Sequence, residues 1–204
     1  MKALTTEDIQ ALAKQFDIGA SKIKAVSLVE SSGSGFYPDY VKIKGKEIVH
    51  PYAGELVVRF EGHWFRKFTK GIYDTTNPDL SYTDWKQGNK HHRGLKEFSR
   101  FYDAFELDKE AAWQSTSWGM FQTMGFNYKA CGYDSPKDMI VDYYKGEVTQ
   151  LKGFLNYLQD KDILDDLKAG RFSTFARIYN GRDFKKHGYD TKIANFDKQH
   201  LGKI

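Results

Sequence analysis

The chain has 204 residues and a mass of 23.6 kDa, with 40% hydrophobic and 28% charged residues. This length suits one compact domain. The 31 basic and 27 acidic residues leave a net charge of +4, which favours an acidic surface but is too small to indicate a nucleic-acid-binding protein. Cys131 is the only cysteine, which excludes an intrachain disulfide framework and a cysteine-based zinc site.

No apolar run approaches the ~20 residues of a membrane-spanning helix. The first residues also lack the apolar stretch of a signal peptide. We therefore expect a protein that is made in the cytoplasm without a signal peptide and does not insert into membranes. We also expect a monomer. Any target outside the cytoplasm would be reached after release or export.

The N-terminal part of the chain predicts two helices followed by strands. Thr5 or Thr6 can cap a helix that runs to about Phe16, and Ser21 can cap a second one that runs to about Ser31. Small residues then end the second helix at 31–35. Residues 41–44 and 56–61 predict strands, with a turn at 45–46, and form a small β-hairpin in our interpretation.

The rest of the chain, after a polar and irregular segment at 71–94, predicts helices. Their expected ranges are 95–105, 109–115, 135–144, 147–159, 163–168, 174–179 and a stretch after residue 189. There is no internal repeat, low-complexity tract or linker. The sequence therefore predicts a mainly α (α+β) fold in one domain over residues 1–204.

Glu30 is the first candidate for catalysis. It follows Ile23 and Val26 on one face of the second helix, and apolar residues cover much of the rest of that helix. Desolvation and the negative end of the helix dipole should raise its pKa, as a general acid requires. The competing interpretation is a glutamate at a frayed helix end, exposed or paired with a lysine.

Glu61 is the contrasting carboxylate. It shares a strand face with Arg59, which predicts a polar, partly solvated environment in which Glu61 stays ionised. Two carboxylates in opposite environments are what cleavage of a glycosidic bond requires. Spacing alone is a weak signal, and Glu47 and Glu55 compete for the role.

Three short sequence motifs provide evidence beyond the pair Glu30 and Glu61. They are Glu30-Ser31, Ser117-Trp118-Gly119-Met120-Phe121-Gln122 and Ala176-Arg177-Ile178-Tyr179-Asn180-Gly181. Their order resembles the lysozyme-like superfamily, in which a Glu-Ser helix end, a Gly-x-x-Gln turn and a Tyr-Asn helix end line one sugar cleft. The resemblance implies a lysozyme-like fold for this chain, with the small β-hairpin as an insertion.

A closer resemblance covers nearly the whole chain. Its strings are Val29-Glu30-Ser31, Gly33-Ser34-Gly35-Phe36, Phe60-Glu61-Gly62-His63, Met124-Gly125-Phe126-Asn127-Tyr128, Tyr179-Asn180-Gly181 and Gly188-Tyr189-Asp190. Together they are similar to the phage and bacterial N-acetylmuramidase family. The resemblance implies a peptidoglycan hydrolase that cleaves the β-1,4 bond between N-acetylmuramic acid and N-acetylglucosamine, as in phage endolysins that lyse the host.

Carried over by position, the resemblance implies Glu30 as the general acid and Glu61 as the second catalytic carboxylate. The substrate-binding positions that it implies are His63, Ser117, Gln122, Tyr179 and Asn180. It implies glycan strands as the partner, and neither a cofactor nor a metal. The segment 37–56 looks longer than the family's usual connection, so the hairpin expected to bear Glu61 should be differently placed. The chain also appears without the separate wall-binding module of many endolysins.

Other features keep simpler interpretations. Trp118, Phe121 and Cys131 are expected in the core, and the basic run 86–100 as a solvated face that can also hold anionic wall polymers. The pair His91-His92 has no obvious third metal ligand. Two alternative functions stay open: a lytic transglycosylase, which needs only the acid and forms anhydro sugars, and a wall-binding module without turnover.

Overall fold

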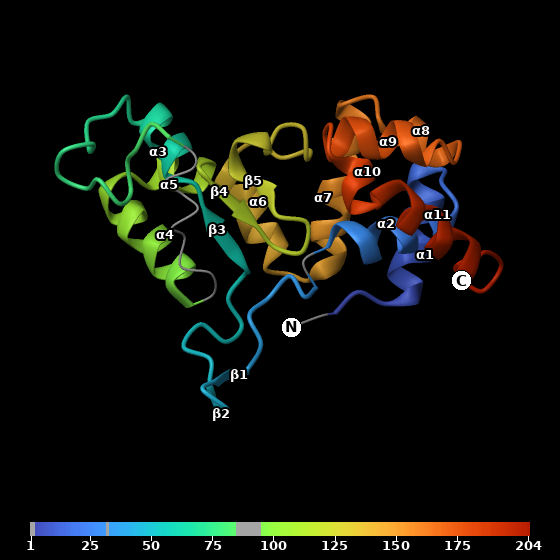
Figure 1. Ribbon diagram of the computed structural model, residues 1–204, viewed down its shortest axis with the longest axis horizontal. Coiled ribbons are helices and arrows are strands. Elements are labelled where there is room, and N and C mark those ends of the chain that lie inside the picture. The colour runs from blue at the N-terminus through green and yellow to red at the C-terminus, as the bar shows by residue number, and fades with distance from the viewer. Residues whose placement is uncertain (1–2, 32, 85–94) are drawn as a thin grey trace.

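The computed structural model describes residues 3–31, 33–84 and 95–204 and is mainly helical, as the sequence predicts (Figure 1). Its α-helices are α1 (Thr6–Phe16), α2 (Ala20–Glu30), α3 (Gly62–Phe68), α4 (Leu95–Leu107), α5 (Lys109–Gln114), α6 (Pro136–Tyr143), α7 (Glu147–Asp160), α8 (Leu164–Lys168), α9 (Phe172–Tyr179), α10 (Phe184–His187) and α11 (Tyr189–His200). The strands are β1 (Tyr40–Ile43), β2 (Lys46–Val49), β3 (Val58–Phe60), β4 (Thr116–Trp118) and β5 (Thr123–Met124). A 3₁₀ turn, η2, covers Gly125–Asn127.

The first two helices begin differently. Thr5 caps α1 as predicted, because its side chain accepts from the backbone N–H of Asp8 while Asp8 bonds back to Thr5. The prediction that Ser21 caps the second helix is wrong. The N-cap of α2 is Gly19, and the hydroxyl of Ser21 instead donates to Asp197 of α11 at 2.5 Å. The hydroxyl of Ser21, which the sequence suggested as a helix cap, is therefore used in a tertiary hydrogen bond.

The strands form two separate sheets. β1 and β2 make an antiparallel hairpin whose turn residues, Lys44 and Gly45, both have positive φ, at 49° and 79°. β3 pairs instead with β4, and β4 with β5. The expectation that the hairpin bears Glu61 is therefore wrong. The buried side chains of Leu56, Val58 and Phe60 fix β3 to the core, whereas all four residues of β2 are exposed.

Two hydrophobic clusters lie side by side. One joins α1, α2, α7, α8, α9 and α11, and the other joins β3, α3, α4, α5 and α6 (Figure 1). The chain crosses between them after β4: Trp118 belongs to the sheet-side cluster, and Phe121 belongs to the helical one, where its ring stacks on Phe154 at 4.3 Å. Trp118, Phe121 and Cys131 are buried, as predicted.

No helix in the described ranges is both long enough and apolar enough to cross a bilayer.

Candidate active site

Glu30 is the last residue of α2, whose C-terminal end is directed toward the three-stranded sheet (Figure 1). Ile23 and Val26, on the same helix face, are fully buried. The side-chain amide of Asn180, which directly follows α9, donates to Oε2 of Glu30 at 2.8 Å. Oε1 is buried, and no group in the described part of the chain bonds to it. One carboxyl oxygen is thus fixed by Asn180, and the other is enclosed without a partner among the described residues.

Burial raises the pKa of Glu30 from 4.5 to about 7, and the hydrogen bond from Asn180 opposes part of that rise. This is the raised pKa that the sequence predicts for an acid. The expectation that this helix is buried nearly all round is wrong, however, because Leu28 is 45% exposed on its outer side. α2 packs against α11 and α1, and Glu30 at its end is partly buried.

Tyr179 lies beside this acid but serves the core. Its ring stacks on Phe175 at 5.7 Å and meets Phe154 edge-on at 5.4 Å. Burial, and next the charge of Glu30, raise its pKa. Tyr179 is therefore a neutral phenol whose ring packing holds the last residue of α9.

Glu61 is held by its backbone on both sides. Its N–H donates to Ser115 at 2.9 Å, and its carbonyl accepts from Trp64 at 2.9 Å in the first turn of α3. The side chain is 16% exposed, with Nε of Arg59 at 3.0 Å from Oε1. Nδ1 of His63 lies 3.6 Å from Oε2, beyond a short hydrogen bond.

The surroundings of Glu61 are drier than the sequence predicts. Burial raises the pKa of Glu61, while the charges of Arg59 and Arg100 lower it. Burial and then the charge of Arg59 lower the pKa of His63, so this imidazole is neutral near neutral pH. The arginines, rather than solvent, are what favour an ionised Glu61.

Two residues behind Glu61 were not predicted. Glu97 of α4 is 5% exposed and accepts from the backbone N–H of Phe60 at 3.0 Å. Arg100 lies 3.4 Å from Oε1 of Glu97. The prediction of a solvated basic face is therefore wrong at Arg100; residues 86–94 of that run lie outside the described residues. The i, i+3 spacing of Glu97 and Arg100 was a usable signal for this pair.

Ser117 and Gln122 hold each other in the turn between β4 and β5. The hydroxyl of Ser117 donates to Oε1 of Gln122 at 3.0 Å. The amide of Gln122 donates to the carbonyls of Val57 at 3.2 Å and Gly119 at 2.9 Å. Both amide ends of Gln122 are thus used within the protein, so its side chain shapes the turn.

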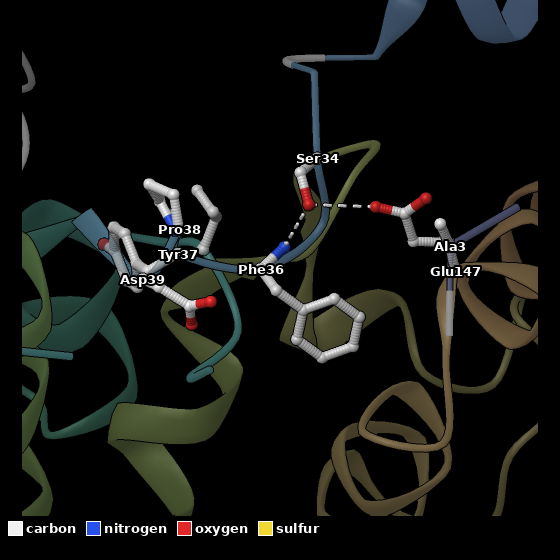
Figure 2. Close-up of a pocket in the computed structure, with 8 residues that line it drawn as sticks. Ala3, Ser34, Phe36, Tyr37, Pro38, Asp39 and Glu147 are labelled. Atoms are coloured by element: carbon white, nitrogen blue, oxygen red, sulfur yellow. Dashed lines mark hydrogen bonds between the residues drawn. The ribbon is translucent and has the colours of Figure 1, made fainter. Parts of the chain in front are cut away.

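The first turn of α7 connects both halves of this region. Glu147 accepts from the hydroxyl of Ser34 at 3.0 Å (Figure 2). It also accepts from the N–H of Gly35 at 2.9 Å, and both bonds lie in the loop that follows Glu30. Gln150 accepts from the N–H of Met120 at 2.7 Å. One helix end therefore fixes the loop after the acid and the turn that holds Gln122.

A cavity of about 450 Å³ lies at the loop that Glu147 holds (Figure 2). Its lining is Ala3, Ser34, Phe36, Tyr37, Pro38, Asp39, Val57 and Glu147. None of the seven residues predicted for the site lines it.

The competing carboxylates lie elsewhere. Glu47 is exposed on β2, and Glu55 accepts from the hydroxyl of Tyr144 at 2.5 Å. The pair His91-His92 lies outside the described residues. Within the described ranges, no group of three or more His, Cys, Asp or Glu side chains could hold a metal ion.

Comparison with known proteins shows the family to which this chain belongs. The model of the N-acetylmuramidase family matches residues 19–201. The crystal structure of a Burkholderia AP3 phage endolysin superposes with a TM-score of 0.81 at 27% identity, over 98% of this chain and 72% of that chain. No curated protein matches. The chain therefore belongs to the N-acetylmuramidase family and is a peptidoglycan hydrolase with a lysozyme-like α+β fold.

Proposed function

We propose that this chain hydrolyses the β-1,4 bond between N-acetylmuramic acid and N-acetylglucosamine. Glu30 is the general acid, and Glu61 is the second catalytic carboxylate. Family membership supports the reaction class. The two carboxyl groups support the assignment of roles, because each is held by its own partners at the end of a buried element.

The environment of Glu30 carries this proposal. A pKa of about 7 leaves a large share of the carboxyl groups protonated near neutral pH. Oε2 accepts the hydrogen bond from Asn180, and Oε1 is buried without a partner among the described residues, so a rotation of the carboxyl group has to present its proton to the substrate. The proton can then pass to the glycosidic oxygen as the bond to the muramic anomeric carbon breaks.

Glu61 then acts on the positive charge that develops at that carbon. Its ion pair with Arg59 favours the carboxylate form. A carboxyl separation of about 5–5.5 Å would place it as the nucleophile of a retaining enzyme, and about 6.5–9.5 Å as the base that activates water in an inverting one. In both cases water supplies the oxygen on the muramic product.

The remaining predicted residues have positioning roles in this proposal. Asn180 orients the acid, Tyr179 supports Asn180, and Ser117 with Gln122 shapes the opposite wall. His63 lies next to Glu61 as a neutral group that can bond a sugar hydroxyl. No step requires a cofactor.

We further propose that the chain acts as a phage endolysin: a monomer made in the cytoplasm that reaches the wall after release and binds no nucleic acid. The superposed structure, itself a phage endolysin, supports this role. Turbidity of cells that express the chain, with and without a membrane-permeabilising agent, tests the release step. Lysis without permeabilisation would contradict it.

Mass spectrometry of the soluble fragments from purified peptidoglycan tests the reaction. Wild type should release fragments with reducing-end muramic acid, and Glu30→Gln should release none. Anhydro ends, one water lighter, would instead identify a lytic transglycosylase and leave Glu61 without a catalytic role. Binding to the wall without fragments would identify a binding module.

A further inference from the structure

The β1–β2 hairpin, residues 40–49, carries three lysines on a projecting arm. Lys42, Lys44 and Lys46 are exposed, and Glu47 is the one acidic residue among them. Figure 1 shows the hairpin projecting from the body, away from both hydrophobic clusters. We call residues 40–49 the basic arm. A small excess of positive charge on a projecting ribbon suits an anionic partner.

The base of the basic arm is fixed although its strands are exposed. The N–H of His50 donates to the carbonyl of Asp39 at 2.8 Å, which closes the base of the arm. The ring of His50 stacks on Tyr37 at 4.7 Å, and His50 is 5% exposed. A two-stranded hairpin is only marginally stable alone. Here the buried base fixes the orientation of the hairpin relative to the body, so the three lysines have defined positions.

The arrangement along the arm distinguishes between possible partners. The exposed apolar side chains of Tyr40 and Val49, 58% and 67% exposed, lie opposite each other at the base. The lysines occupy the outer part. A hairpin that enters a bilayer needs the reverse order, with apolar groups at the tip and charges behind them. The arm instead presents separate ammonium groups, with Glu47 directly opposite Lys42 and no acidic residue of the arm opposite Lys46.

We propose that the basic arm binds the carboxylates of the peptides attached to the glycan strands. This inference rests on the proposed function, which brings the arm to peptidoglycan. Those peptides extend from the muramic sugar and end in carboxylates, so they can contact a part of the enzyme outside the glycan cleft. Ion pairs between lysines and exposed carboxylates are individually weak and add up over several contacts.

The test measures binding to purified sacculi by sedimentation, in the Glu30→Gln background so that the wall stays intact. The arm variant is Lys42→Gln, Lys44→Asn and Lys46→Gln; asparagine at 44 keeps the positive φ of the turn. The matched control is Lys14→Gln, Lys137→Gln and Lys152→Gln, which removes the same charge from exposed sites on α1, α6 and α7. Circular dichroism checks that each variant is folded.

We expect the arm variant to bind about tenfold more weakly and the control variant less than twofold, with the difference lost at high salt. Arginine at all three arm positions should restore binding. Equal binding by wild type and arm variant would overturn the proposal, and so would equal losses in both triple variants. Loss of binding to vesicles of anionic phospholipid, with sacculus binding unchanged, would make the arm a membrane contact and overturn it as well.

A second measurement separates this proposal from the proposed function. With Glu30 intact, wild type and the arm variant should cleave glycan strands stripped of their peptides at equal rates. A slower rate for the arm variant on these strands would overturn the role of the peptides. If wild type cleaves neither stripped nor native strands, the proposed hydrolysis fails, and the binding result still decides the role of the arm.

Discussion

The side-chain amide of Asn180 donates a 2.8 Å hydrogen bond to Oε2 of Glu30, joining the end of α9 to the end of α2. Burial raises the pKa of Glu30, and this bond restrains the rise. The bond therefore controls two properties of the acid, its orientation and the pH at which it loses its proton.

Asn180→Leu removes the bond while leaving the site dry. We expect kcat to fall about 100-fold, because the acid is no longer oriented. The pKa of Glu30 should rise further, so the alkaline limb of the rate profile should move to higher pH. The value of kcat on soluble glycan strands checks the first effect, and a pH profile of kcat/KM checks the second. An alkaline limb that moves to lower pH would contradict this account of the bond.

Glu30 should also make stability depend on pH. Its pKa is raised in the folded state, so the stabilising contribution is complete below about pH 4.5 and is lost as the pH rises to about 7. The shift corresponds to about 3 kcal/mol. The free energy of unfolding of Glu30→Gln, relative to wild type, should therefore rise by up to that amount between pH 5 and pH 8, as measured by urea titration.

The matched control for that titration is Glu106→Gln, an exposed glutamate on α4. Its difference from wild type should stay within about 0.5 kcal/mol across the same range. Parallel curves for Glu30→Gln and Glu106→Gln would show that Glu30 is not buried as described.

Arg59 should set the acidic limb of the rate profile. Its Nε lies 3.0 Å from Oε1 of Glu61, and its charge lowers the pKa of that carboxyl. Arg59→Gln should move the acidic limb to higher pH, and the effect should be small because the side chain of Arg59 is largely exposed. Arg59→Lys should move the limb less. If Arg59→Gln leaves the acidic limb at the same pH, that limb does not report the ionisation of Glu61, and the proposed role of an ionised Glu61 is wrong.

Gly119 should be sensitive to substitution because of Gln150. Its φ is 69°, and an added Cβ would lie 2.5 Å from Oε1 of Gln150. Gly119→Ala should cost about 3 kcal/mol of stability, combining overlap with backbone strain. Gly45→Ala is the matched control, since Gly45 has a φ of 79° with open space around it and should cost about 1 kcal/mol.

A double-mutant cycle isolates the overlap. In the Gln150→Ser background, Gly119→Ala should cost less than in wild type, because the crowded amide has gone. Thermal unfolding of the four proteins checks this. Additive effects would mean that Gln150 does not restrict Gly119.

Local signals in the sequence predicted much of the helical structure. Ser135 accepts from the N–H of Asp138 with Pro136 in the first turn of α6, as its cap-proline pattern indicates. The prediction that Ser21 caps α2 failed because its hydroxyl donates a hydrogen bond to Asp197, 176 residues away. Pattern reasoning sees groups that can cap a helix, but it cannot see a distant partner that competes for them.

The features that the sequence did not predict depend on pairing between residues that are far apart in the chain. The pairing of β3 with β4 joins Arg59 to Ser117, and strands as short as β4 and β5 leave almost no periodicity to read. The candidate carboxylates could be chosen because each ends a patterned segment. The i, i+3 spacing of Glu97 and Arg100 could have suggested that these two residues pair, but nothing local shows that their helix packs behind β3.

The hydrogen bond between His50 and Asp39 closes the base of the hairpin, so that the hairpin can be exchanged independently of the rest of the fold. The chain leaves and re-enters the body at one point, so the length between these residues is nearly free: doubling a loop costs only about 0.6 kcal/mol. Residues 40–49 can therefore be shortened, extended or replaced without moving Glu30 or Glu61, so the proposed wall contact and the proposed catalytic pair are structurally separate.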